Sequence, residues 1–133
     1  MTLPPARLTL MAKGGLVMSP IQKKTLSQPD STRISGKGRV ELVTLGGITI
    51  GRATLQPGWR WSTSVKPLTD EESCPASHLQ YHVSGRLHVV LDDGSEEEFV
   101  AGDVSLIPPG HDAWVVGEEP VVLIELSGLV HYH

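Results

Sequence analysis

The sequence predicts an all-β fold, either a sandwich or a barrel of about eight to ten short strands. Between Gly38 and Leu126, apolar and polar residues alternate in short segments, and none shows the 3.6-residue period of an amphipathic helix. Turn-forming residues separate these segments about every eight to twelve residues. Two turns, Gly46-Gly47 and Asp92 to Ser95, have compositions favoured in tight β-hairpins, because their glycines tolerate a positive φ.

The first predicted hairpin joins residues 40–45 to residues 48–55 across the Gly46-Gly47 turn. In the second of these strands the apolar phase changes at Gly51, so that Ala53 and Leu55 become the apolar pair. A glycine at a change of phase predicts a β-bulge or a bend at that residue.

Two tryptophans follow the predicted turn at Pro57-Gly58. Trp59 and Trp61 are two residues apart, so a strand places both indoles on one face, where packing in or around the core is the ordinary role. Residues 65–76 form a predicted loop that contains Cys74. Loops of this length are unusual in a β domain and are often functional or disordered.

A strand at residues 78–83 carries most of the polar residues that the alternation turns inward. His78, Gln80 and His82 share one of its faces, and Leu79, Tyr81 and Val83 share the other. Further strands are predicted at residues 87–91, 96–100, 104–108, 111–117 and 121–126.

Residues 102–114 predict a strand, a rigid turn and a second strand. The turn is Pro108-Pro109-Gly110, because two prolines fix φ and remove donors while glycine allows a positive φ. In the second strand His111 is in phase with Ala113, so both point to the same side.

Composition limits the classes of function. The 133 residues suffice for one domain, and a net charge of −4 without a Lys/Arg-rich patch argues against a nucleic-acid partner. No apolar run approaches the roughly 20 residues of a membrane-spanning helix, so no membrane association is expected. The single cysteine forms no intramolecular disulfide and favours a reducing compartment, so a cytoplasmic location is expected. Residues 1–36 are predicted to be a tail, partly disordered or paired with a sheet edge, followed by a barrel at 37–128 and a short tail at 129–133.

Two motifs in this order resemble the signatures of the cupin family. Gly102, Pro108 and Gly110 match the second motif, G-x5-P-x-G-x2-H, up to its histidine. Pro57-Gly58 followed by residues 78–85 resembles the first motif, G-x5-H-x-H-x3-4-E-x6-G, with a longer loop inserted. The resemblance implies a single-domain jelly-roll β-barrel, open at one end, that forms a homodimer.

The metal-ligand positions of the cupin motifs are altered in this sequence. Counting from Gly58, the two first-motif histidines fall on Ser64 and Lys66, and counting back from Gly85 the glutamate falls on His78. The histidine of the second motif falls on Ala113. Hydroxyl and ammonium groups are poor ligands for transition metals, so the standard cupin metal site is not expected.

A different donor set is possible in the same region. His78 keeps a ligand type at a ligand position, and His111 lies on the same side of its strand as the altered second-motif position. Cys74, or an acid from Glu71 or Glu72, can complete a site for Zn, Fe, Mn or Ni if the long loop folds over the barrel mouth.

Three functions follow from these observations and stay open at this point. The first is a small-molecule-binding cupin with a polar and aromatic pocket, a small organic ligand, and a non-standard or absent metal site. The second is an enzyme: either a metal-dependent enzyme of the dioxygenase, isomerase or lyase type that uses His78 and His111, or one in which a metal-free histidine acts as acid or base. The ordinary histidine pKa of about 6.5 suits proton transfer in either case. The third is a structural barrel that only dimerises. The predicted pocket residues are Trp59, Trp61, His78, Gln80, His82 and His111.

Overall fold

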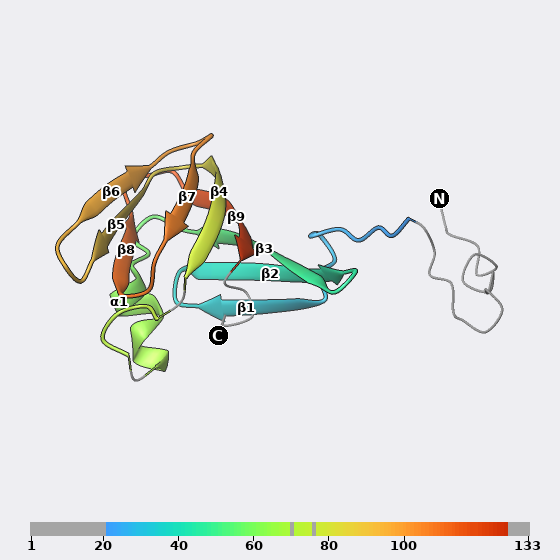
Figure 1. The fold of residues 1–133 in the computed structure, drawn as a ribbon, viewed down its shortest axis with the longest axis horizontal. Helices are drawn as coiled ribbons and strands as arrows, with labels where there is room; N and C mark the ends of the chain where they lie inside the picture. The colour runs from blue at the N-terminus through green and yellow to red at the C-terminus, as the bar shows by residue number, and fades with distance from the viewer. Residues whose placement is uncertain (1–20, 70, 76, 128–133) are drawn as a thin grey trace.

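The computed structural model describes residues 21–69, 71–75 and 77–127, and within them the protein is built almost entirely of β-strands (Figure 1). The predicted all-β class is therefore confirmed. The elements are β1 (Ser31–Ser35), β2 (Gly38–Leu45), β3 (Ile48–Leu55), α1 (Trp61–Ser64), the 3-10 helix η2 (Lys66–Leu68), β4 (His78–Ser84), β5 (Leu87–Leu91), β6 (Glu96–Phe99), β7 (Val104–Ile107), β8 (His111–Val115) and β9 (Val121–Ser127).

The strands form two antiparallel sheets that face each other. The larger sheet has the order β1-β2-β3-β9-β4-β7, and the smaller sheet has the order β6-β5-β8. The chain passes from the larger to the smaller sheet after β4, returns at β7, and repeats the exchange at β8 and β9 (Figure 1). β1 lies within residues 1–36 and pairs with β2 along its length, at the edge of the larger sheet.

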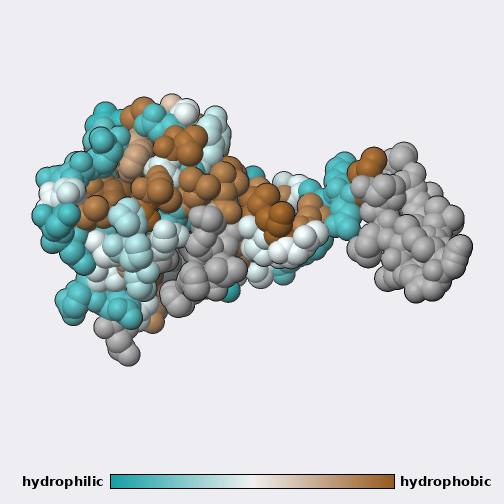
Figure 2. Space-filling view, viewed as in Figure 1, coloured by the Kyte–Doolittle hydropathy of each residue, from teal (hydrophilic) through white to brown (hydrophobic). Residues whose placement is uncertain are grey.

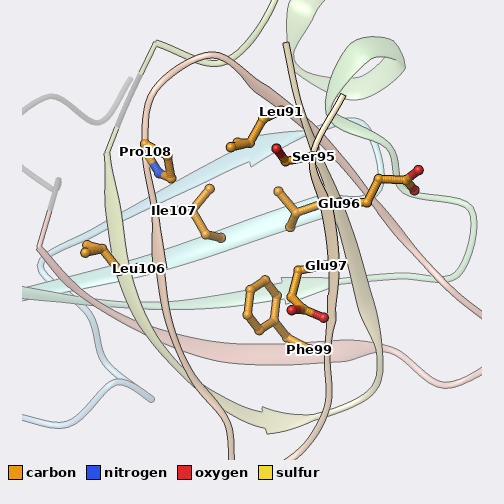
Figure 3. Close-up of a pocket in the computed structure, with 9 residues that line it drawn as sticks. Leu91, Ser95, Glu96, Glu97, Phe99, Leu106, Ile107 and Pro108 are labelled. Carbon is orange, nitrogen blue, oxygen red and sulfur yellow. The ribbon is translucent and has the colours of Figure 1, made fainter. Parts of the chain in front are cut away.

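The two sheets do not close into a fully hydrogen-bonded barrel in the described residues. β7 pairs with β4 and β6 pairs with β5, but no ladder joins β6 to β7. Side chains fill this opening: Phe99 and Ile107 point into it from opposite sides and leave a cavity of about 110 Å³ between the two edges (Figure 3). The architecture is therefore an open β-sandwich.

The predicted hairpin turns are present. Gly46 and Gly47 join β2 to β3 with φ values of 57° and 80°, and Gly94 lies in the β5–β6 turn with a φ of 92°. Gly85 lies between β4 and β5. Its φ of 79° favours glycine, and close packing gives a second reason for glycine here. A Cβ at this position would lie 2.4 Å from the carbonyl oxygen of Pro120, so only glycine lets the two chain segments approach this closely.

The bulge predicted at Gly51 is wrong. β3 pairs with β2 in one unbroken register from Ile48 to Leu55. The apolar phase changes because Ile48 and Ile50 lie on the outward face, where Ile48 is 64% exposed, whereas Gly51, Ala53 and Leu55 share the buried face. Register shifts do occur, but between β4 and β9, at Leu79/Gln80 and at His82/Ser84.

The segment after β3 differs from the predicted strand and loop. Trp61 begins α1 instead of continuing a strand, and η2 follows within the predicted loop. Both indoles are still buried in the same core, as expected from their spacing. Isolated bridges join Arg60 to Trp114 and Cys74 to His111, so the segment is fixed along β8 at both ends. No helix in the described part of the chain has the length and apolar character needed to cross a bilayer.

Candidate metal and ligand site

A cavity of about 740 Å³ lies between the two sheets, within the range of small-molecule pockets. Its walls are mainly apolar and aromatic, and they include Val40, Ala53, Leu55, Trp59, Trp61, Leu87, Ala113 and Leu123. Exposed residues of β1 and of the segment after η2, such as Ile34 and Glu71, lie at its rim. The polar residues deeper in the lining are Cys74, His78, Gln80, His111 and Glu125.

Three buried donor residues meet at one side of this cavity. One ligand atom each from Cys74, His78 and His111 lies within 4.8 Å of the other two. The three residues come from the long loop, β4 and β8, so both sheets contribute. The backbone fixes the loop member, because the Cys74 N–H donates to the His111 carbonyl at 2.8 Å and the Gly110 N–H donates to the Cys74 carbonyl at 2.7 Å.

Glu125 of β9 orients His78. The His78 Nδ1–H donates to Glu125 Oε2 at 2.9 Å, and the Gln80 amide donates to Glu125 Oε1 at 2.8 Å. The carboxylate is almost fully buried, so it requires these two donors to offset the loss of water. With Nδ1 engaged as a donor, Nε2 is the ring nitrogen of His78 that points toward Cys74.

His111 is oriented in the same way by a backbone carbonyl. Its Nδ1–H donates to the Pro108 carbonyl oxygen at 2.7 Å, which leaves Nε2 as its available lone pair. Metal-binding histidines almost always donate their second ring N–H to a carboxylate or a carbonyl. Both histidines of the cluster meet this condition, and the residues therefore fit a metal ion with two imidazole ligands and one thiolate ligand.

His78 binds its proton more tightly than an ordinary histidine does. Burial lowers the pKa of His78, but hydrogen bonds with Cys74 and Glu125 outweigh burial and raise that pKa to about 9. The Cys74 Sγ lies 3.6 Å from His78 Nε2. A cation bound by these atoms would compete with this proton.

His82 lies outside the lining of the cavity, although it shares a face of β4 with His78 and Gln80. Its Nε2 is hydrogen-bonded to Ser105 Oγ at 2.8 Å, and its ring stacks on Phe99 with centroids 5.0 Å apart. Burial lowers the pKa of His82, so the ring is neutral near pH 7. Ser105 also reaches Gln80 Oε1 at 3.5 Å, which ties His82 to the polar residues beneath the cluster.

Comparisons with known proteins identify the fold. No family model matches the chain, and no curated protein matches it. A protein of unknown function (DUF1255) from Acidithiobacillus ferrooxidans is 23% identical, with a TM-score of 0.55 over 74% of this chain and 88% of its own. A structural-genomics protein of unknown function from Rhizobium leguminosarum is 22% identical, with a TM-score of 0.56 over 80% and 94%. A sugar phosphate isomerase from a cupin superfamily, from Silicibacter pomeroyi, is 18% identical, with a TM-score of 0.54 over 78% and 73%.

The chain has a cupin-like fold. Within this cupin-like fold, the first-motif positions counted from Gly58 do not face the cluster. Ser64 ends α1, and the Lys66 ammonium pairs with Glu72 at 3.1 Å. Ala113, at the second-motif histidine position, lines the cavity.

Counting the motif positions back from His78, instead of forward from Gly58, gives a different alignment for Cys74. Counting back from His78 across three residues places Cys74 at the second histidine position, because the long loop is inserted before the histidine pair and not after it. The same spacing places Glu72 at the first position, but Glu72 is paired with Lys66 outside the cluster. Glu71 lines the cavity without joining the cluster.

Glu125 is the site residue that the sequence reasoning missed. Its signal was a single carboxylate within an otherwise apolar strand, Val121 to Leu126. A buried charge in such a strand requires a partner, and His78 provides one.

Proposed function

We propose that this protein is a small-molecule-binding domain with a non-standard metal site. The metal is held by Cys74, His78 and His111, and the organic ligand occupies the adjoining cavity. One observation carries the proposal: three buried donors converge on the wall of a 740 Å³ cavity, and both histidines have their second ring nitrogen engaged by an acceptor. This combination is typical of a functional metal site and unnecessary for packing alone.

The donor set favours Zn²⁺ over the other candidate ions. Thiolate sulfur is a soft ligand, and a thiolate with two imidazoles suits Zn²⁺ better than it suits Mn²⁺ or other oxygen-preferring cations. Three protein donors leave one position of a tetrahedral ion for water or a ligand. A bound Zn²⁺ would supply Lewis acidity at that end of the cavity.

The ligand class follows from the cavity walls. Apolar and aromatic side chains, including Trp59 and Trp61, form most of the lining, and the polar groups gather at the metal-site end and at the rim. This arrangement fits a small molecule with an apolar body and one metal-binding polar head group.

Metal content and cobalt substitution test the metal site. We expect protein purified without added metal to bind close to one equivalent of Zn²⁺, and Co²⁺-loaded protein to show a thiolate-to-cobalt charge-transfer band. Cys74→Ser should remove the band, and His111→Ala should weaken Zn²⁺ binding at least tenfold. His88→Gln is the matched control, because His88 stacks on Trp114 away from the cavity. Zn²⁺ binding that is absent, or unchanged in Cys74→Ser, would overturn the proposal.

A paired probe tests the ligand pocket. Benzohydroxamate has an apolar ring and a metal-binding head, and benzamide has the same ring with a much weaker head. We expect Zn²⁺-loaded protein to bind benzohydroxamate at least tenfold more tightly than benzamide, with a change in tryptophan fluorescence. Equal affinity for both, or equal binding to His111→Ala, would contradict a ligand bound at the metal.

A metal-dependent enzyme is the second candidate function. The observation that favours it is the incomplete ligand set, because catalytic zinc sites use three protein ligands and structural sites use four. Turnover that depends on Zn²⁺ and is lost in both Cys74→Ser and His111→Ala would support this candidate over simple binding.

A further inference from the structure

Arg33 places a positive charge at the rim of the large cavity. It belongs to β1, the edge strand of the larger sheet, and it is an exposed residue of the cavity lining. Four of the five residues of β1 are polar. The visible surface along β1 is accordingly mostly pale or hydrophilic in Figure 2, whereas hydrophobic residues gather over the position that β4 and β7 have in Figure 1. A polar strand with a cationic residue therefore borders the cavity.

The strand register fixes the direction of Arg33. Arg33 lies opposite Val40 of β2, and Val40 lies opposite Ala53 of β3. Ala53 in turn lies opposite Leu123 of β9. Directly opposite residues of antiparallel strands point to the same face of a sheet, and the other three members of this row are buried residues of the cavity wall. Arg33 therefore points to the cavity side, at the end of a row that forms part of its apolar wall.

Arg33 and the metal-binding cluster lie far apart on the inner face of the larger sheet. The cluster residue His78 is on β4, four strands away from β1 in the order β1-β2-β3-β9-β4. At about 4.8 Å per strand this is about 19 Å across the sheet, and side chains that point into the cavity shorten the gap. The lining between them is mainly apolar and includes Val40, Leu55 and Leu123. A ligand that contacts both ends must therefore have an elongated apolar body.

We infer that the ligand of this cavity is an elongated molecule with an anionic group, such as a carboxylate, at the end opposite its metal-binding group, and that Arg33 binds this anion. The inference rests on the proposed function, because the metal site holds the head group of the same ligand. A guanidinium suits this role, since its planar fork binds a carboxylate through two parallel N–H···O bonds. Its five donors allow it to hold a ligand anion together with a contact inside the protein.

Two carboxylates also line the described part of the cavity. Glu125 lies at the metal-site end, where its oxygens accept hydrogen bonds from His78 and Gln80. Glu71 is exposed at the rim, and it belongs to the loop after η2. Arg33 differs from Glu71 because a strand register holds it on the cavity side. The sign of the ligand's end group therefore follows from Arg33.

Two probes that differ only in their end group test the inference. Suberate monohydroxamate and octanohydroxamate have the same chain length and the same metal-binding head, but the first ends in a carboxylate and the second in a methyl group. We expect Arg33→Gln to weaken binding of the suberate probe to Zn²⁺-loaded protein by about three- to fivefold at low ionic strength, because Arg33 is an exposed ion-pair partner. Its affinity for octanohydroxamate, followed like that of the first probe by tryptophan fluorescence, should not change. Added salt should reduce the difference.

Two controls separate a contact at Arg33 from general electrostatic attraction. Succinate monohydroxamate has the same two end groups on a chain too short to span the apolar wall, so Arg33→Gln should leave its affinity unchanged. Arg39→Gln is the matched variant. Arg39 lies on the adjacent strand β2, next to Val40 and hence on the opposite face of the sheet, where it pairs with Glu41. The variant removes the same charge from the same sheet and should leave the affinity for the suberate probe unchanged.

Three results would overturn the inference. If octanohydroxamate binds and Arg33→Gln does not weaken the suberate probe, the inference fails while the proposed function stands. If neither hydroxamate binds to Zn²⁺-loaded protein, the proposed function fails and the inference fails as well. Glu71→Gln removes a negative charge from the same rim and should not weaken the suberate probe. Equal losses in Glu71→Gln and Arg33→Gln would assign the effect to a general disturbance of the rim.

Discussion

Replacing Glu125 by Gln tests whether the buried carboxylate positions His78 for metal binding. Glu125 accepts two hydrogen bonds, from His78 Nδ1–H at 2.9 Å and from the Gln80 amide at 2.8 Å. A glutamine has nearly the same shape but only one acceptor oxygen, so its amide group must face one of these two donors. If the amide faces His78, the ring proton moves to Nε2, the atom that points toward Cys74.

The magnitude of the effect follows from this conflict. Loss of an outer partner of a metal-binding histidine costs about 10- to 100-fold in metal affinity, or about 1.4–2.7 kcal/mol. We expect the Zn²⁺ dissociation constant of Glu125→Gln to rise by such a factor, measured by competition with a chromophoric chelator at fixed pH. The Co²⁺ charge-transfer band should persist at saturating metal, because Cys74 is unchanged.

Glu41→Gln provides the matched control for this experiment. Glu41 is the other buried glutamate in the described residues, and it is paired with Arg39 and Arg52 on the outside of the larger sheet. This variant should bind Zn²⁺ as the wild type does. A Glu125→Gln protein whose Zn²⁺ affinity stays within about threefold of that control would refute the positioning role.

Three further predictions concern the turn at Gly85, the ion pairs of Glu41 and the size of the cavity. Gly85→Ala should lower the free energy of unfolding in urea by about 2–4 kcal/mol, and Gly94→Ala by about 1 kcal/mol, because both strain a positive φ but only the first places a Cβ against the backbone of Pro120. Equal losses would contradict the close approach of Gly85 to Pro120. A hydrogen bond with Arg52 is the main cause that lowers the pKa of Glu41, so the ionised Glu41 side chain adds stability above pH 4.5 and loses it as the pH falls through the lowered value. The stability difference between wild type and Glu41→Gln should therefore shrink in acid, and a difference that grows would contradict this sign. Ala53→Phe, which fills part of the cavity, should weaken benzohydroxamate binding at least tenfold at unchanged Zn²⁺ stoichiometry, and unchanged probe affinity would place the ligand elsewhere.

Local sequence signals predicted most of the strands and turns correctly. Alternation reports which residues share a face of a strand, and glycine with proline reports where a strand must end, so both are readable without tertiary contacts. The error at Gly51 has the same origin. Where β3 extends past its pairing with β9, its apolar residues Ile48 and Ile50 lie on the outward face, so the apolar alternation there does not mark the buried face. A single sequence cannot distinguish this change from a bulge.

The candidate site was predictable in part. Five of the six predicted pocket residues line the cavity: Trp59, Trp61, His78, Gln80 and His111. Strand parity places the last three inward, whereas Trp59 precedes α1 and Trp61 begins it. His82 is also inward but lies behind the lining, since parity does not report depth. Cys74 was a candidate among other loop residues, and only the folded loop places it, instead of Glu71 or Glu72, beside the two histidines.

The sequence by itself determined the fold class, the hairpins and the inward direction of His78, Gln80, His82 and His111, because these depend on the period of a strand and on the backbone preferences of glycine and proline. Tertiary structure decided which of those residues meet. Cys74, His78 and His111 come from a loop and from strands of two different sheets, and Glu125 joins them from a third strand. Distances between strands that are far apart in the chain depend on how the two sheets pack, and local periodicity contains no information about that packing.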